Sequence, residues 1–295
     1  MLNDLNDYSV PMSEILGKYF DTENIAYWMA FQLLTGNIDT QNRNVYLYSP
    51  TNSDTFYLLD WDNDGMLMRK EYEIRQRADG QSWENGISNY WGNILLRRCL
   101  QTKSFRTALD KAVNDEYKYM SAGRINSMVR QYRSIVEPYV QKMPDSMHEP
   151  LTSSQYDTVA DQLHSEIEQN YQTYQTGFNK PMPFYIGKPT PANGKLRLNW
   201  DVAYDFNDED LRYAVTVSKD YAGDDVVFSQ RDVVLPEAVM DMPGEGQYFI
   251  KVSVSNASGY TQDAFDHYIT DGNKIYGTKC FYVKADGSIV EDANE

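Results

Sequence analysis

Three polar side chains in the first quarter of the sequence have the types and spacing that phosphoryl transfer requires. Asp39 and Asn44 stand five residues apart, and Asp62 follows the next strand-like run. A carboxylate can take the proton of a hydroxyl group, an amide oxygen can hold Mg²⁺, and a second carboxylate can bridge the metal to phosphate. The Asp-x-x-x-x-Asn spacing is common by chance, and a surface turn capped by Asp or Asn also explains it. Whether the three residues form a site or an ordinary turn therefore depends on the elements around them.

A helix is predicted directly before Asp39. Asp21 is a suitable N-cap and Gly36 a suitable C-terminal stop. Between them, apolar side chains recur at helical spacing: Ile25, Trp28, Met29 and Leu33. Such a helix would deliver the chain to Asp39.

A hairpin is predicted between Asp39 and Asp62. The runs 45–48 and 56–59 are apolar on both faces and flank the turn-forming residues SPTNSD. Runs of that kind are typical of buried strands, so the hairpin is expected to be buried. Antiparallel pairing would bring Asp39, before the first strand, close to Asp62, after the second. The polar, glycine-containing run 73–93 that follows predicts a loop over the site.

The acidic turn after the hairpin also matches a calcium-binding pattern. Asp60, Asp62, Asp64 and Gly65, followed after five residues by Glu71, satisfy the EF-hand loop D-x-[DN]-x-[DN]-G-x5-E. An EF-hand needs an incoming helix, whereas TFYLLD is strand-like, so a metal site for phosphoryl transfer is the preferred interpretation. Both interpretations predict a divalent metal at Asp62.

The segment from about Ile25 to Gly65, with GNIDTQNRNVYLY and FYLLDWDND, resembles the catalytic core of the CotH family, the spore coat protein H-like atypical kinases. The resemblance implies a protein kinase that transfers the γ-phosphate of ATP to Ser or Thr hydroxyls. It implies that Asp39 is the catalytic base, and that Asn44 and Asp62 hold ATP through Mg²⁺ or Mn²⁺. Asp64 would support a second metal ion or orient Asp62. The likeness continues weakly to about residue 145.

The sequence departs from the family in one respect. The family's nucleotide-gripping segment, with a Lys and its partner carboxylate, precedes this core, and the chain begins too late to include it. The chain is therefore expected to be an incomplete kinase region, whose activity depends on whether that segment is supplied. The alternative is a non-catalytic surface binding or adhesion module in which residues 60–71 form a structural Ca²⁺ loop.

Composition limits the partners. The 295 residues include 27 basic and 43 acidic side chains, for a formal charge of −16, which argues against a nucleic-acid partner. No apolar run is long enough to span a membrane, and no signal-peptide pattern is present. Two distant cysteines, Cys99 and Cys280, do not make a disulfide framework. The resemblance implies an extracellular or cell-surface location, with a protein substrate or cell-surface or spore-coat proteins as partners.

The sequence predicts an α+β protein of two domains. Helical periodicity over 104–117, 125–139 and 156–174 gives way to a Pro- and Gly-rich stretch at 180–194, and alternating strand patterns follow. The predicted first domain, 1–180, is a mostly helical, kinase-like C-terminal lobe with a β-hairpin catalytic core. The second, 184–295, resembles a fibronectin type III or immunoglobulin-like β-sandwich, with Trp200 as its core Trp and Tyr248 near a tyrosine-corner position.

Overall fold

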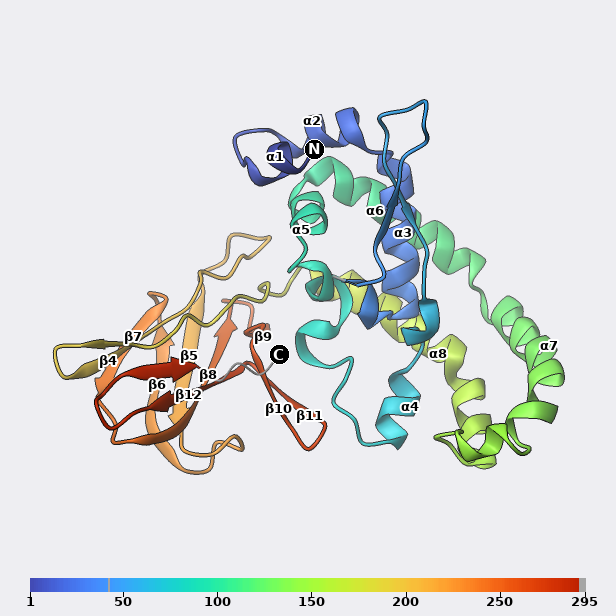
Figure 1. Ribbon diagram of the computed structural model, residues 1–295. Coiled ribbons are helices and arrows are strands. Elements are labelled where there is room, and N and C mark those ends of the chain that lie inside the picture. The colour runs from blue at the N-terminus through green and yellow to red at the C-terminus, as the bar shows by residue number, and fades with distance from the viewer. Residues whose placement is uncertain (42, 292–295) are drawn as a thin grey trace. The chain divides into compact units, whose positions relative to one another are not determined.

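The computed structural model describes residues 1–41 and 43–291. The chain is α+β, with a helical unit and a β unit (Figure 1). The helical unit comprises residues 1–80 and 85–175, and the β unit comprises residues 81–84 together with the chain from 176 onward. The sequence-based division at 180–184 kept residues 81–84 in the first domain. The structure assigns this tetrapeptide to the β unit.

The helical unit is built mainly from helices, and one small hairpin and several 3-10 turns lie in the segments between them. Its helices are α1 (Leu2–Asn6), α2 (Met12–Tyr19), α3 (Thr22–Thr35), α4 (Arg69–Ile74), α5 (Ile94–Gln101), α6 (Lys103–Tyr119), α7 (Ala122–Val140) and α8 (Ser153–Gly177). The hairpin consists of β1 (Tyr46–Tyr48) and β2 (Tyr57–Leu59). The 3-10 turns of this unit are η1 (Ile38–Thr40), η2 (Asn63–Gly65), η4 (Gly86–Tyr90) and η5 (Asp145–Met147). No helix in the described part of the chain has the length and apolarity needed to cross a membrane.

Helix α3 confirms the helix predicted before Asp39. The Asp21 side chain accepts a hydrogen bond from the backbone N–H of Asn24 at 2.9 Å, and Gly36 ends the helix in the left-handed conformation (φ 61°). Ile25, Met29 and other apolar side chains of α3 are completely buried. The helix runs beside α6 in the ribbon (Figure 1). Each such side chain contributes about 1.5–3 kcal/mol of hydrophobic stabilisation, which makes α3 a rigid support for the turn that follows it.

The hairpin forms, but the prediction that it is buried is wrong. Residues 46–48 of β1 pair antiparallel with residues 57–59 of β2. The side chains of Tyr46, Leu47, Tyr48 and Leu59 are 42–49% exposed, and only that of Leu58 is buried. The reason is one-sided packing: α3 packs against β2, and the Asn24 side chain bonds both the N–H and the C=O of Leu58, at 2.7 and 3.1 Å. Alternation alone cannot show whether a second layer covers a hairpin.

The polar run 73–93 is also more ordered than predicted. It contains the end of α4, the 3-10 turn η3 (Ser82–Glu84) and η4 rather than a single loop. Trp83, Ile87, Tyr90 and Trp91 are buried. These apolar residues, spaced through a polar segment, anchor it by hydrophobic burial.

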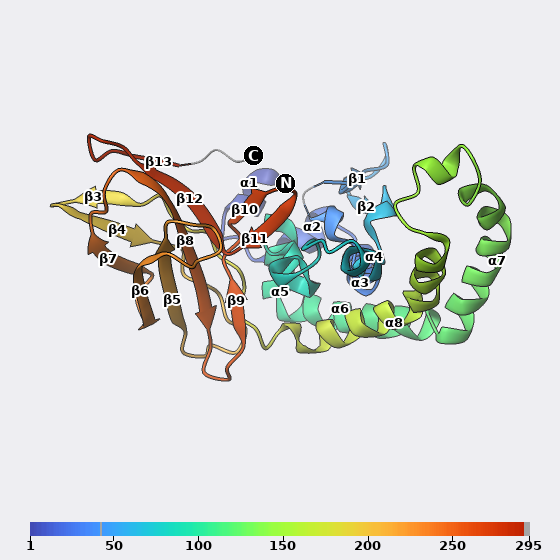
Figure 2. The ribbon, with the colours of Figure 1, turned by 90° about the horizontal axis from the view of Figure 1, so that it is seen from below.

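The β unit contains two facing sheets and a hairpin. One sheet has the order β13 (Ile289–Glu291), β12 (Thr278–Val283), β8 (Gly246–Ser255), β5 (Arg212–Ser218) and β6 (Val226–Val233), with β9 (Thr261–Asp263) also on β8. The second has the order β3 (Thr190–Ala192), β4 (Lys195–Asn199) and β7 (Glu237–Asp241), and β10 (His267–Thr270) pairs with β11 (Asn273–Tyr276). The layers are visible in Figure 2.

Side chains of both sheets meet in one core, as in a β-sandwich. Leu196 and Leu198 of the smaller sheet and Val215 and Ile250 of the larger one belong to the same hydrophobic cluster. Trp200 is buried in this cluster, and the Tyr248 hydroxyl donates to the carbonyl of Gly244 at 3.0 Å, a bond of the tyrosine-corner kind. These features support an immunoglobulin-like sandwich. The fibronectin type III assignment stays a prediction.

Candidate functional site

The turn after α3 brings the first two predicted site residues together. Asn37 stands before the 3-10 turn η1, and its side-chain oxygen accepts from the backbone N–H of Asp39 at 3.2 Å. The Asn44 amide Nδ2 donates to Asp39 Oδ2 at 2.9 Å. This bond fixes one oxygen of the half-buried Asp39 carboxylate, and Oδ1 is then the atom of the Asn44 side chain that could accept a metal ion.

Tyr90 supports this turn from the interior. Its hydroxyl donates to the carbonyl of Asn37 at 3.0 Å and lies 3.2 Å from the hydroxyl of Thr40. Burial raises the pKa of Tyr90 to about 12, so the hydroxyl stays protonated and keeps its donor at neutral pH. The backbone that carries Asp39 is thus held by a buried hydrogen bond rather than by solvent-exposed contacts.

The second predicted segment lies against the first. Asp62 has a left-handed backbone (φ 54°, ψ 57°), which Asp tolerates better than most residues, and it leads into η2. A Cβ atom added to Gly65 would lie 3.1 Å from Asn37 Oδ1 and 3.4 Å from the Cβ of Asp39. The missing side chain at residue 65 therefore allows the loop of Asp62 and Asp64 to approach the Asp39 turn closely. The side chains of Asp62 and Asp64 are exposed.

A buried glutamine ties the two segments together. Gln32, which is 0% exposed, donates from Nε2 to Asp60 Oδ1 at 2.9 Å and to Asn63 Oδ1 at 3.3 Å. The same oxygen of Asn63 accepts from Asn37 Nδ2 at 3.2 Å. A chain of amide hydrogen bonds therefore runs from the Asp39 turn to the residues on both sides of Asp62.

Glu116 of α6 adds a protonated carboxyl group near Asp60. Burial raises the pKa of Glu116 to about 8, and the negative charge of Asp60 contributes to the shift. Its Oε2 atom is buried without a hydrogen-bond partner among the residues that the structure describes. At neutral pH Glu116 is therefore largely uncharged.

The alternative calcium loop lacks part of its expected context. The element before Asp60 is strand β2, and Glu71, in the first turn of α4, accepts from Arg75 Nη1 at 2.8 Å. Within residues 1–41 and 43–291, no three His, Cys, Asp or Glu side chains are grouped so that they could hold a metal ion. A metal at Asp62 would thus need neutral ligands such as the Asn44 amide, or oxygens from a bound phosphate. Both metal interpretations stay predictions.

Comparison with known proteins identifies the family. The family model described as CotH kinase protein matches residues 1–174. The chain belongs to the CotH kinase family. No curated protein and no solved structure matches the chain. The CotH match covers Asp39, Asn44, Asp62 and Asp64, and it ends where the β unit continues from residue 176.

The sequence predicts the candidate site residues of the CotH region, but it does not predict the residues that hold them in position. Asn37 could have been recognised, because an Asn two residues before Asp39 is typical of an Asx turn. Gln32 and Tyr90 have no such local signal, because their bonds join positions that are 28–53 residues apart. The sequence pattern predicts for Gly65 only a place in a calcium motif, whereas in the structure this glycine allows close packing.

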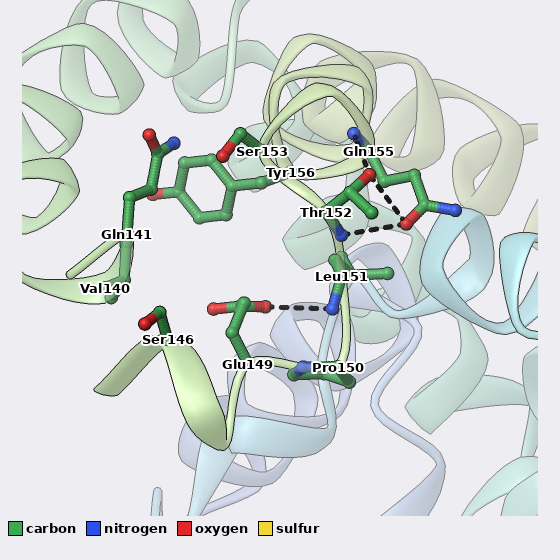
Figure 3. Close-up of a pocket in the computed structure, with 10 residues that line it drawn as sticks. All are labelled: Val140, Gln141, Ser146, Glu149, Pro150, Leu151, Thr152, Ser153, Gln155 and Tyr156. Atoms are coloured by element: carbon green, nitrogen blue, oxygen red, sulfur yellow. Dashed lines mark hydrogen bonds between the residues drawn. The ribbon is translucent and has the colours of Figure 1, made fainter. Parts of the chain in front are cut away.

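The hollow drawn in Figure 3 lies elsewhere in the CotH-matched region. It has a volume of about 480 Å³ and lies between the end of α7, η5 and the start of α8. Its hydrogen bonds cap the helix: the N–H of Thr152 donates to Gln155 Oε1 at 2.8 Å, and the N–H of Leu151 approaches Glu149 Oε1 at 3.4 Å. None of the predicted site residues line it.

Proposed function

We propose that this CotH-family chain contains the C-terminal catalytic part of an atypical protein kinase that transfers the γ-phosphate of ATP to a Ser or Thr hydroxyl of a protein. The observation that carries the proposal is the 2.9 Å bond between Asn44 and Asp39, together with the packing of the Asp62 loop against Asp39 at Gly65. The turn that carries the base and the amide ligand then lies against the loop that carries the proposed metal-binding carboxylate. The family match supports kinase chemistry in general.

Each side chain has a distinct role in this proposal. Asp39 accepts the proton of the substrate hydroxyl, and the bond from Asn44 orients its carboxylate. Oδ1 of Asn44 and the exposed Asp62 would hold Mg²⁺ or Mn²⁺, with Asp64 orienting Asp62 or supporting a second ion. When bound, the metal neutralises charge on the phosphate oxygens. The donor set fits a hard cation, because every candidate ligand atom is oxygen.

A second candidate is a non-catalytic surface binding module with a structural Ca²⁺ loop at Asp60–Glu71. It is favoured by the exposed aromatic hairpin around Tyr46 and Tyr48 and by the β-sandwich outside the family match. Under either proposal we place the protein outside the cell or at its surface, with a protein as its partner, on the CotH likeness alone.

Calorimetric titration of the chain with ATP and Mg²⁺, compared with Asp62→Asn and Asp39→Asn, tests the proposal. Asn keeps the left-handed backbone at residue 62 but removes the charge, so binding should weaken at least tenfold. Asp39→Asn should retain nucleotide binding while phosphoryl transfer falls by roughly 10²–10⁴-fold, the range of a general base.

Unchanged binding in Asp62→Asn would overturn the assignment of Asp62. Tight Ca²⁺ binding without any nucleotide binding would instead favour the second candidate. A titration with Ca²⁺ alone is therefore run on the same three proteins.

A further inference from the structure

Two side chains of α8 bond the backbone segments on which the Asp39 and Asp62 loops depend. Asn170 and Glu166 stand four residues apart, on one face of the helix, and both are buried, at 6% and 2% exposed. Neither belongs to the proposed ligand set. Their polar groups are nevertheless satisfied by the two segments that lead into and out of the site.

Asn170 holds the segment that leads to Asp39. Its Nδ2 donates to the carbonyl of Leu34 at 3.0 Å, one of the carbonyl groups at the end of α3 that lack a partner within the helix. A Cβ atom added to Gly36 would lie 2.7 Å from that nitrogen, so the amide packs directly against the helix end. Asp39 follows three residues after Gly36.

Glu166 and Asn170 together hold the segment that leaves Asp62. The carboxylate of Glu166 accepts from the backbone N–H groups of Arg69 and Lys70, at 3.2 and 2.7 Å, and thereby caps α4. The Arg69 guanidinium donates to Asn170 Oδ1 at 3.2 Å. The same segment is bonded to the end of α3 by the N–H of Leu67, which donates to the carbonyl of Thr35 at 2.8 Å.

We propose that Asn170 and Glu166 are positioning residues that set the separation of the Asp39 and Asp62 loops for phosphoryl transfer. The inference rests on the proposed function, but its structural content does not depend on activity. Asn170 is the link between the two segments, because its amide bonds Leu34 on one side and Arg69 on the other. Misplacement of reacting groups by about 1 Å can cost a hundredfold in rate.

The test compares Asn170→Ala and Glu166→Gln with Tyr171→Phe. The Tyr171 hydroxyl donates to Asn114 Oδ1 at 2.9 Å, so this control removes a hydrogen bond from the same helix without touching either segment. Two properties are measured on the full chain: kcat and KM for phosphoryl transfer at saturating Mg²⁺ and ATP, and hydrogen exchange of the amides of Leu67, Arg69 and Lys70.

If Asn170 and Glu166 are positioning residues, kcat should fall at least tenfold in Asn170→Ala. It should fall less in Glu166→Gln, which keeps one acceptor oxygen. KM for the protein substrate should change little, and the three amides should exchange faster than in Tyr171→Phe. Equal kcat in all three folded variants, with transfer intact in the unmodified chain, would overturn the positioning role.

Failure of the proposed function gives a different result. If the unmodified chain transfers no phosphate, faster exchange in Asn170→Ala and Glu166→Gln alone still supports the link between the segments. Unchanged exchange in those two variants would then refute the link as well.

Discussion

Two carboxylates of the β unit, Glu84 and Asp205, and two of the helical unit, Asp62 and Asp64, have opposite environments. In the β unit, Glu84 and Asp205 are buried, at 5% and 6% exposed, and their oxygens accept hydrogen bonds from neighbouring side chains and backbone N–H groups. In the helical unit, Asp62 and Asp64 are exposed, and neither side chain has a hydrogen bond within the described parts of the chain. Buried charges are retained where partners compensate them, whereas exposed carboxylates keep their contact with water and need no partner in the protein. The difference separates structural carboxylates from those available for a ligand.

Among the substitutions that test this difference, the one at Glu84 is expected to have the largest effect on the free energy of unfolding. Its two oxygens accept from Lys274 Nζ and the Tyr276 hydroxyl, both at 2.7 Å, while Trp83 packs against Phe265. Glu84→Ala removes the buried acceptor of both bonds, so the free energy of unfolding should fall by about 3 kcal/mol. Urea denaturation followed by tryptophan fluorescence measures the loss.

Asp64→Ala is the matched substitution at an exposed carboxylate. It should change the free energy of unfolding by no more than about 0.5 kcal/mol, because a solvent-exposed side chain without partners contributes little to stability. If the two substitutions cost the same, the distinction between structural and ligand-binding carboxylates does not hold.

The same contrast shows how far the sequence could predict the structure. The cap and stop of α3 and the pairing of β1 with β2 follow from local chemistry, and both were correct. The exposure of the hairpin depends on whether a second layer exists, which no local pattern encodes. The bond between Leu34 and Asn170 joins residues 136 positions apart. The residues next to Leu34 or Asn170 in the sequence give no sign that either one makes such a bond.

Residues 81–84 illustrate the limit most directly. Polar neighbours on both sides make this stretch typical of a surface loop, yet Trp83 and Glu84 are buried in the β unit. Their partners, Lys274 and Tyr276, stand about 190 residues later. Trp83, within a polar run, was the available signal, because large aromatic side chains seldom remain fully exposed.

Substitution of Glu116 should have an intermediate effect on the free energy of unfolding, and this effect depends on pH. Its folded-state pKa of about 8 lies above the usual 4.5, so the folded protein binds this proton more tightly than the unfolded chain does. The contribution to stability is complete below about pH 4.5 and is lost as the pH rises through about 8. Glu116→Gln should therefore flatten the decline in unfolding free energy between pH 5 and pH 9, by about 1–2 kcal/mol after allowance for solvent screening.

Denaturation of Glu116→Gln in urea at pH 5 and pH 9 measures the slope, which is the change in the free energy of unfolding with pH. Glu168→Gln, at an exposed position on α8, is the control and should leave the slope unchanged. A slope in Glu116→Gln equal to that of the unmodified chain would place the pH dependence in other groups.

The smallest expected effect is at Glu71, and it decides between the two metal interpretations. In a calcium loop that begins at Asp60, Glu71 would be the bidentate ligand at position 12, and its loss would weaken binding severely. In the structure its Oε1 atom is paired with Arg75 at 2.8 Å, and the residue lies in the first turn of α4. We therefore expect Glu71→Gln to change Ca²⁺ affinity less than about twofold, since a partly exposed ion pair must be broken before Glu71 can bind a metal.

Calorimetry with Ca²⁺ measures this, with Asp62→Asn as the variant that removes a ligand common to both interpretations. A tenfold loss in Glu71→Gln would show that Glu71 leaves Arg75 to bind calcium, and the exposed aspartates would then belong to a calcium loop instead of a phosphoryl-transfer site.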